Sequence, residues 1–298
     1  MRTVIERYRN NSISSLTLIN YFLLILIGLI MFYPFWYILM YSLSTYSEVI
    51  HKNFLILPVG FTMDNMLYVL KNASMYVGVI NSAFVTIVGT ILSVIITLMI
   101  AYPMSKRIHG INTISFFVYF TMLFSGGMIP IYLIVKDTGL MNSLWSLIIP
   151  QLVNPFNLYI LRNFIKGIPE SMVEAATIDG AGHMTVLTRI IIPLALPIIA
   201  TIALFYGARY WNAFFDAVIY ISDPKKWTIQ LVIRDLIMQQ NPEVSGGSTV
   251  TTGKMATANT LETVKMALVV FSVLPMVAVY PFLQKYFVKG VMVGAVKS

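Results

Sequence analysis

The chain contains no cysteine and few charges, and each shortage excludes a class of protein. Without cysteine it has no disulfide, no thiolate metal site and no cysteine nucleophile. Only 11% of its 298 residues are charged while 58% are hydrophobic, and the mean hydropathy is +0.80. This composition is too apolar for a soluble domain of that length. The sequence therefore indicates a membrane protein.

Patterns for catalysis and nucleotide binding are lacking as well. No Ser-His-Asp or paired-carboxylate arrangement stands out, and the histidines at positions 51, 109 and 183 fall in predicted loops without metal-ligand spacing. The segment Gly247–Met255 superficially resembles a phosphate-binding loop. Five residues rather than four separate its glycines, however, and Met255 takes the place of Ser or Thr. We therefore expect no catalytic site, no metal and no cofactor in this chain.

Long apolar runs recur along the chain. About twenty apolar residues in a helix cross the ~30 Å hydrocarbon core of a bilayer. Helices are expected because every backbone polar group must find its partner inside the lipid, and the weak alternation of a β-barrel is absent. The sequence predicts an all-α membrane protein with six transmembrane helices. The expected spans are about Leu16–Leu43, Gly78–Met104, Asn112–Val135, Ser143–Phe164, Ile190–Ile221 and Glu262–Tyr286.

Two spans carry helix-breaking residues. Gly126, Gly127 and Pro130 predict that the third span is broken or bent at its outer end. Pro150 and Pro155 interrupt the fourth span. The first span follows a basic start, as in a signal peptide, but its apolar run is too long for one and no small-x-small cleavage site follows. We expect this first span to be retained.

Lys and Arg give the orientation. Six spans place both termini and the loops after spans 2 and 4 on one side, which carries 11 Lys and Arg against 4 acids, a net +7. The opposite side carries 8 of each sign, and one arginine lies within a span. The positive-inside rule therefore places both termini in the cytoplasm. The net charge of +8 is explained as a topology signal, so no nucleic-acid partner is expected.

A charged, glycine-marked segment, EAATIDGAGHMTVLTRIIIP at Glu174–Pro193, separates two apolar runs. Pro169 suits a helix start, because the first turn leaves its N–H groups unpaired. Glu170 and Glu174 follow one turn apart, near the positive end of the helix dipole. The glycines at 180 and 182 are expected to end this helix, and the next membrane run is expected to begin near Ile190.

This spacing resembles the EAA loop of ABC-importer permeases: E-A-A, three residues, Gly, nine residues, Ile, one residue, then an apolar residue and Pro. Each fixed position matches except Ile192, where leucine is usual. An ordinary amphipathic loop is the alternative. The resemblance implies a coupling helix seated in a groove on a cytoplasmic ATPase subunit, with small residues that allow close approach. The residues assigned to this coupling are Glu170, Glu174, Ala175, Ala176, Asp179, Gly180, Ala181 and Gly182.

Further segments extend the resemblance over most of residues 78–298. Gln284–Gly290 and Gly294–Lys297 look like the C-terminal tail of permeases in the maltose-transporter (carbohydrate uptake type 1) family. Phe124–Pro130 and Asn157–Asn163 are similar to a branch linked to complex and acidic oligosaccharides. The resemblance implies the type I ABC importer permease fold. It also implies that the tail reaches between the ATPase subunits, through Lys289, Gly290, Gly294 and Lys297.

The tail and one long loop each leave an alternative open. The tail could be a solvated basic end near anionic lipid, although Gly290 and Gly294 favour an extended insertion. The loop at 239–258 is rich in Gly, Ser and Thr. It is either a disordered connector or, as the family suggests, a scoop-like loop that enters the binding protein and helps to release sugar.

Polar residues in spans 4 and 5 are candidates for a substrate path. Arg209 and Asp216 stand seven residues apart, so two helical turns would place them on one face. An intramembrane charge usually faces a pore or a partner. The alternative is a structural ion pair, or an interfacial anchor with Trp211 at headgroup depth. The assigned residues are Arg209, Trp211, Asn212, Asp216, Asn154 and Asn157.

The resemblance implies a membrane permease subunit of a binding-protein-dependent ABC importer. Its cargo would be an oligosaccharide, with an acidic one suggested by the branch. Its expected partners are a second, related permease in a heterodimer, two ATPase subunits that bind ATP-Mg, and an extracytoplasmic binding protein. A self-sufficient secondary transporter or channel is the alternative, and it would need broken-helix repeats in both halves, of which no inverted repeat is found.

The predicted organisation divides the chain into four parts. These are residues 1–15 as a cytoplasmic segment, 16–77 as the first transmembrane helix with an extracytoplasmic segment, 78–286 as the permease core, and 287–298 as a cytoplasmic tail. Within the core, the coupling loop is expected at 166–189 and an extracytoplasmic loop at 222–261. The predicted location is the cell membrane, with several passes.

Overall fold

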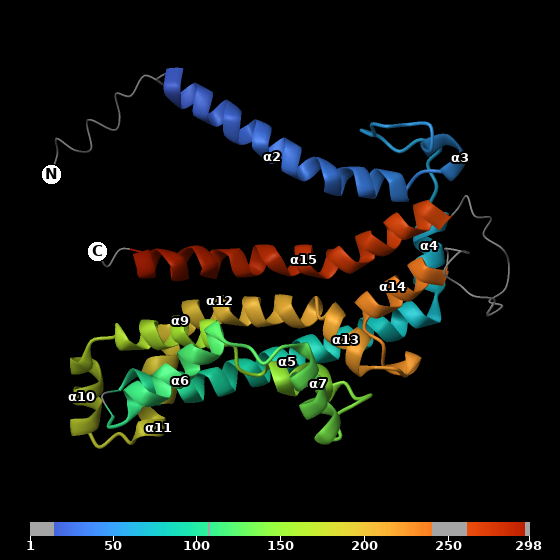
Figure 1. The fold of residues 1–298 in the computed structure, drawn as a ribbon. Coiled ribbons are helices and arrows are strands. Elements are labelled where there is room, and N and C mark those ends of the chain that lie inside the picture. The colour runs from blue at the N-terminus through green and yellow to red at the C-terminus, as the bar shows by residue number, and fades with distance from the viewer. Residues whose placement is uncertain (1–14, 107, 240–260, 296–298) are drawn as a thin grey trace. The chain divides into compact units, whose positions relative to one another are not determined.

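The computed structural model describes residues 15–106, 108–239 and 261–295, and the loop predicted at 239–258 lies almost wholly outside them. Within these residues the regular secondary structure is helical, apart from one isolated bridge between Ser44 and Phe61 (Figure 1). The predicted all-α fold class is confirmed. The chain forms two compact units: residues 1–69 with 250–270, and residues 70–249 with 271–298. Each unit is described by itself.

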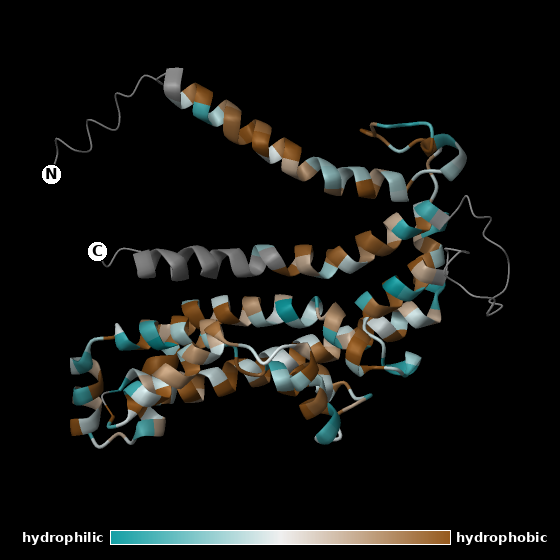
Figure 2. Cartoon of the chain, viewed as in Figure 1, coloured by the Kyte–Doolittle hydropathy of each residue, from teal (hydrophilic) through white to brown (hydrophobic). Residues whose placement is uncertain are grey.

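The first unit is built around α2 (Ser15–Ser42), which matches the predicted first span. Figure 2 shows most of this helix as hydrophobic, and its apolar side chains from Leu18 to Phe35 are largely exposed, as suits a helix surrounded by lipid or by other membrane helices. The unit also contains α3 (Tyr46–Val49), α4 (Asp64–Lys71) and the first turns of α15 (Leu261–Ala295).

Polar contacts fasten α4 to its neighbours in the first unit. The Asn65 side-chain amide donates to the carbonyls of Ser42 at 2.9 Å and Ser44 at 3.1 Å. The Thr263 hydroxyl donates to the Asn65 carbonyl oxygen at 3.0 Å. The side chains of Asn65 and Thr263 are both buried, so each bond satisfies a polar group that would otherwise lack a partner. A small apolar cluster around Met40, Tyr41, Val49 and Leu55 completes the packing.

The second unit is organised around α5 (Ala73–Ser105) and α12 (Ile192–Trp211). Small residues on α5 allow close approach, as is typical of packed membrane helices. A Cβ at Gly89 would lie 2.8 Å from ring carbons of Tyr210. The Tyr210 hydroxyl lies 2.8 Å from the Ser93 hydroxyl, and the Tyr206 hydroxyl lies 2.8 Å from that of Thr97. Two buried hydrogen bonds therefore fix α12 against α5.

The breaks predicted for the third and fourth spans are present. The third span divides into α6 (Ile111–Leu123) and α7 (Met128–Asp137), bent by 114°. Gly127 adopts a φ of +86°, which favours glycine, and it directly precedes α7. The fourth span consists of α8 (Trp145–Ile148), a short 3₁₀ turn at Ile149–Gln151, and α9 (Pro155–Lys166).

Length and hydropathy identify four helices in the described residues that could span a membrane, or five if the bent pair counts as one span. The interrupted fourth span is not among them. Six spans with both termini in the cytoplasm therefore remain a prediction.

The expected start of the fifth span was wrong by about two turns. The helix begins at His183, with α11 (His183–Val186), continues through a π-helical turn at Leu187–Ile191, and becomes α12. Thr185, Thr188 and Arg189 are exposed, so a helix can carry these polar side chains before it becomes apolar. The span then breaks after Trp211 and resumes as α13 (Phe214–Tyr220), followed by α14 (Ile229–Gln239).

The C-terminal tail is helical rather than extended as far as Ala295. Helix α15 carries Gly290 and Gly294 in its last turns, so the expected extended conformation was wrong there. Each glycine costs a helix about 1 kcal/mol, and the 35-residue helix continues through both. Lys297 lies outside the described residues.

Candidate functional site

The EAA segment forms a short helix, α10 (Glu170–Ile178), at one end of the second unit, between α9 and α11 (Figure 1). Pro169 occupies the position before it, as the sequence predicts. Gly180 adopts a φ of +81° and donates its N–H to the Thr177 carbonyl at 3.0 Å. The Ala181 N–H donates to the Ala176 carbonyl at 2.9 Å. These two bonds define a Schellman ending, so the prediction that Gly180 ends the helix is confirmed.

The prediction that Gly182 also ends this helix was wrong. It does not end α10 but directly precedes α11, with φ −72° and ψ 165°. Asp179 is the last residue before the left-handed glycine and is exposed. The connection between α10 and α11 therefore contains a single left-handed residue.

The two faces of α10 differ in packing. Val173 and Ala176 pack against the apolar core formed by α5, α9 and α12, and Ala181 joins them. On the opposite face, Glu170 and Glu174 stand one turn apart and are exposed, as is Ala175. Ile178, one further turn along, is 85% exposed. This surface has two acids, a small residue and an unburied apolar tip, which suits contact with another protein.

Among the described residues, neither Glu170 nor Glu174 makes a hydrogen bond or an ion pair with another side chain. Both carboxylates therefore remain available to a basic partner. The structure brings all the assigned coupling residues together on or beside α10.

Arg209 lies near the end of α12, where the fifth span breaks. Its Nη2 donates to the side-chain oxygen of Gln151, on the 3₁₀ turn before α9. The Gln151 side-chain nitrogen in turn donates to Asp216 Oδ2 at 3.2 Å. Arg209 is exposed, and Gln151 and Asp216 are partly buried. One neutral amide thus connects the cation and the carboxylate.

The prediction that Arg209 and Asp216 share one face of a single helix was wrong. They lie on different helices, because Asn212 ends α12 and α13 begins at Phe214. Ala213, between them, has a ψ of 63°, which is not helical. In the part of the chain that the structure describes, Arg209 and Asp216 form no direct ion pair, and Gln151 joins them instead.

The other residues assigned to a substrate path do not join this group. The Trp211 ring is buried and its Nε1 donates to the Ser272 carbonyl on α15 at 2.9 Å. The Asn212 side chain donates to the Ala208 carbonyl of its own helix at 2.8 Å. Both therefore hold the end of α12 in place.

Asn154 and Asn157 shape the start of α9. The Asn154 side-chain oxygen accepts from the Asn157 N–H at 3.2 Å, which is an N-cap. The Asn154 N–H donates to the Tyr206 hydroxyl at 2.9 Å. Asn157 itself is buried. These contacts fix the segment that carries Gln151, a residue whose role the sequence reasoning missed because no spacing connects it with Arg209.

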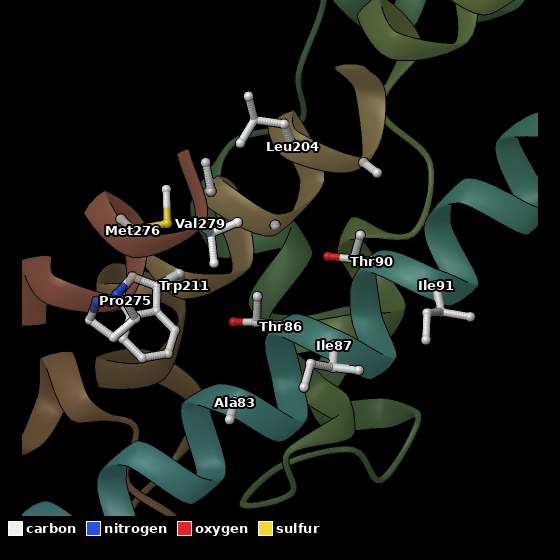
Figure 3. Close-up of a pocket in the computed structure, with 13 residues that line it drawn as sticks. Ala83, Thr86, Ile87, Thr90, Ile91, Leu204, Trp211, Pro275, Met276 and Val279 are labelled. Atoms are coloured by element: carbon white, nitrogen blue, oxygen red, sulfur yellow. The ribbon is translucent and has the colours of Figure 1, made fainter. Parts of the chain in front are cut away.

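A separate cavity of about 420 Å³ lies between α5, α12 and α15 (Figure 3). Its wall is apolar apart from the side chains of Thr86 and Thr90, whose buried hydroxyls have no hydrogen-bond partner among the described residues. A sugar carries hydroxyls around its ring that would need partners, and this wall does not supply them. The cavity is therefore unsuited to a saccharide.

Long apolar helices, a broken span with a charged residue at the break, and a short exposed helix at one end define a membrane-embedded transport component. The chain belongs to the family of binding-protein-dependent transport system inner membrane components, which matches residues 73–293. The family is one of membrane transport subunits, so the expectation that this chain is a permease rather than an enzyme is confirmed.

Individual relatives agree with this family. The polygalacturonan/rhamnogalacturonan transport system permease protein YtcP of Bacillus subtilis (strain 168) is 40% identical over 281 residues, which cover 93% of this chain and 96% of that protein. Protein LplC of the same organism is 41% identical over 273 residues, 91% of each chain.

A solved structure gives the fold. A chain of a bacterial ABC transporter involved in the import of the acidic polysaccharide alginate is 32% identical, with a TM-score of 0.81 and coverage of 93% of this chain and 98% of that one. A second alginate transporter chain, 13% identical with a TM-score of 0.55, shares the fold alone. These findings confirm the type I ABC importer permease fold, the membrane location and the resemblance to permeases of carbohydrate import.

Proposed function

We propose that this chain forms half of the translocation path of an ABC importer and moves an acidic oligosaccharide into the cytoplasm. A second, related permease would supply the other half. Two ATPase subunits would bind ATP-Mg, and an extracytoplasmic binding protein would deliver the cargo. Six spans with both termini and α10 in the cytoplasm fit the distribution of Lys and Arg.

The coupling part of the proposal relies on the exposed face of α10. Glu170 and Glu174 are accessible and unpaired among the described residues, and Ile178 offers an apolar contact beside them. The Schellman ending at Gly180 holds the far end of the helix rigid. A short, rigid helix can transmit movement of an ATPase to α9 and α11, between which it lies (Figure 1). Lys289 to Lys297, in the tail, are assigned a second ATPase contact.

One observation supports an acidic cargo: the exposed guanidinium of Arg209 is held by a neutral amide rather than by a carboxylate. An arginine has five N–H donors in a planar fork that can hold a carboxylate through two hydrogen bonds. Asp216 lies beyond Gln151 and so compensates the charge only from a distance. A uronate carboxylate would find both a charge and free donors at Arg209, whereas a neutral sugar would not need the cation.

The relatives support the same class of cargo. The solved transporter chain at 32% identity belongs to an importer of an acidic polysaccharide, and the 40% identical relative is named for polygalacturonan and rhamnogalacturonan.

The test compares Arg209→Gln with Arg209→Lys in the complete importer reconstituted with its ATPase and binding protein. A hydrogen bond to a charged group contributes about 1.5–3 kcal/mol. Arg209→Gln should therefore reduce uptake of an acidic oligosaccharide by roughly tenfold or more, and basal ATP hydrolysis and assembly should persist. Arg209→Lys keeps the charge but loses the fork, so its uptake should be intermediate.

A purely structural role for Arg209 and Asp216 predicts a different result. In that case Arg209→Gln would lower expression or thermal stability, and Arg209→Gln combined with Asp216→Asn would restore both stability and uptake. Full transport by the double variant would reject the substrate role of Arg209.

A further inference from the structure

A basic cleft lies at the junction of α5, α6 and α9, away from Arg209. Its volume is about 620 Å³. Its lining includes four basic residues, Lys106, His109, Arg162 and Lys166, and the described lining contains no acid. Helices α6 and α9 meet at this end of the second unit, the end that carries α10 (Figure 1).

Neutral groups hold two of the cations in position. The Arg162 Nε donates to the Met104 carbonyl at 2.8 Å, and its guanidinium carbon lies 5.7 Å from the centre of the Tyr159 ring. The Lys106 Nζ lies 5.4 Å from the centre of the Tyr102 ring. Contacts of this kind orient a cation without cancelling its charge. Gathering such cations in one cleft is electrostatically unfavourable unless an anion occupies it.

The backbone adds to the positive potential of the cleft. Helix α6 has thirteen residues and begins directly after Gly110, whose φ is +82°, and its first residues line the cleft. The positive end of the helix dipole therefore points toward the cations. Asn112 and Thr113 supply uncharged polar side chains beside them. A phosphate group combines several acceptor oxygens with negative charge, and so matches this set of donors.

The surface next to the cleft is apolar. No side chain of α6 is buried, and Ile114, Phe116 and Phe117 are exposed. Tyr159 of α9 contacts this helix twice: its hydroxyl donates to the Ser115 carbonyl at 2.5 Å, and its ring meets Tyr119 edge-on. A soluble anion would neutralise the cleft but make no contact with this apolar surface. A molecule with both a phosphate and acyl chains would match both parts.

We propose that this cleft binds the phosphate of an anionic phospholipid from the cytoplasmic leaflet, with the acyl chains along α6. Basic pockets between membrane helices on the cytoplasmic side are suited to such headgroups. The site is distinct from the sugar path and does not depend on which sugar the importer carries.

The test measures binding of phosphatidylglycerol to the complete, delipidated importer, for example by native mass spectrometry, for the native chain and for Lys106→Gln and Lys166→Gln. Each cation near an anionic lipid surface contributes enough that its removal should weaken binding about fivefold. Arg189→Gln is the matched control, since Arg189 is exposed, lies on the helix after α10, and does not line the cleft. Lys106→Arg should retain binding.

Several outcomes would overturn the proposal. Equal weakening by Arg189→Gln would show a diffuse surface charge rather than a site. Equal binding of phosphatidylcholine would show that only the apolar surface of α6 matters. Displacement by inorganic phosphate at similar concentrations would identify a soluble anion as the ligand. Unchanged lipid binding together with loss of the ATPase subunits on purification would show that the cleft contacts protein. The Arg209 variants leave this cleft intact, so the two proposals can fail separately.

Discussion

Replacing Gly180 by alanine should loosen the end of α10 through the backbone alone. At a φ of +81° an alanine adopts a left-handed conformation that costs about 1–2 kcal/mol. No heavy atom in the described part of the chain lies within 4 Å of a Cβ placed at this position, so no steric clash adds to the cost. A loss of about 1–2 kcal/mol corresponds to about a 5–30-fold shift toward the opened helix end.

Hydrogen exchange at the Ala181 amide measures this opening directly, because that N–H donates to the Ala176 carbonyl. Exchange should accelerate by the same factor, and binding-protein-stimulated ATP hydrolysis should fall while basal hydrolysis persists. Gly180→Asn should have a smaller effect, since asparagine tolerates the left-handed region. Gly182→Ala is the control: its φ is −72° and the space around it is open. Equal effects of the two alanine substitutions, or unchanged exchange at Ala181, would show that the left-handed backbone at Gly180 does not hold the end of α10.

Three further substitutions test other parts of the structure. Glu174→Lys should leave the permease folded but reduce copurification of the ATPase and uptake, since it reverses an exposed charge; normal values of both would contradict the coupling role. Gly89→Ala should lower the free energy of unfolding by about 1–3 kcal/mol, because its Cβ would overlap the buried ring of Tyr210. Gly28→Ala, in open space, should leave the free energy of unfolding unchanged. Tyr206→Phe should cost about 1–3 kcal/mol by unpairing two polar groups, and a thermal unfolding curve like that of the exposed-site control Tyr76→Phe would count against this.

Much of the fold could be predicted because a membrane helix must be long and apolar. Hydropathy placed the first two spans within a few residues of α2 and α5, and glycine and proline located the bend before Met128. The start of the fifth span could not be placed in the same way. A helix can extend beyond the lipid into polar sequence. Because Thr185 and Arg189 are polar, hydropathy did not indicate that the helix begins at His183.

The end of α10 could also be predicted from the sequence, because the motif places Gly180 where the backbone is left-handed. The polar group formed by Arg209, Gln151 and Asp216 could not be predicted from the sequence. The break at residues 212–213 contains neither glycine nor proline, so helical spacing was the natural but wrong assumption for Asp216. The actual connector, Gln151, is 58 residues from Arg209 in sequence, and only the packing of α9 against α12 brings them together.

The hydroxyl contacts between α5 and α12 have a mechanical consequence. Tyr206 meets Thr97 and Tyr210 meets Ser93, so the two pairs follow one another in opposite directions along the two helices. Sliding one helix by a turn would set a tyrosine hydroxyl opposite Ala101 or Gly89, neither of which has a side-chain hydrogen-bonding group. The two helices, α5 and α12, therefore behave as one rigid body. Under the coupling role proposed for α10, movement would carry this pair of helices as one body and bend the chain at two breaks, the one before α7 and the one between α12 and α13.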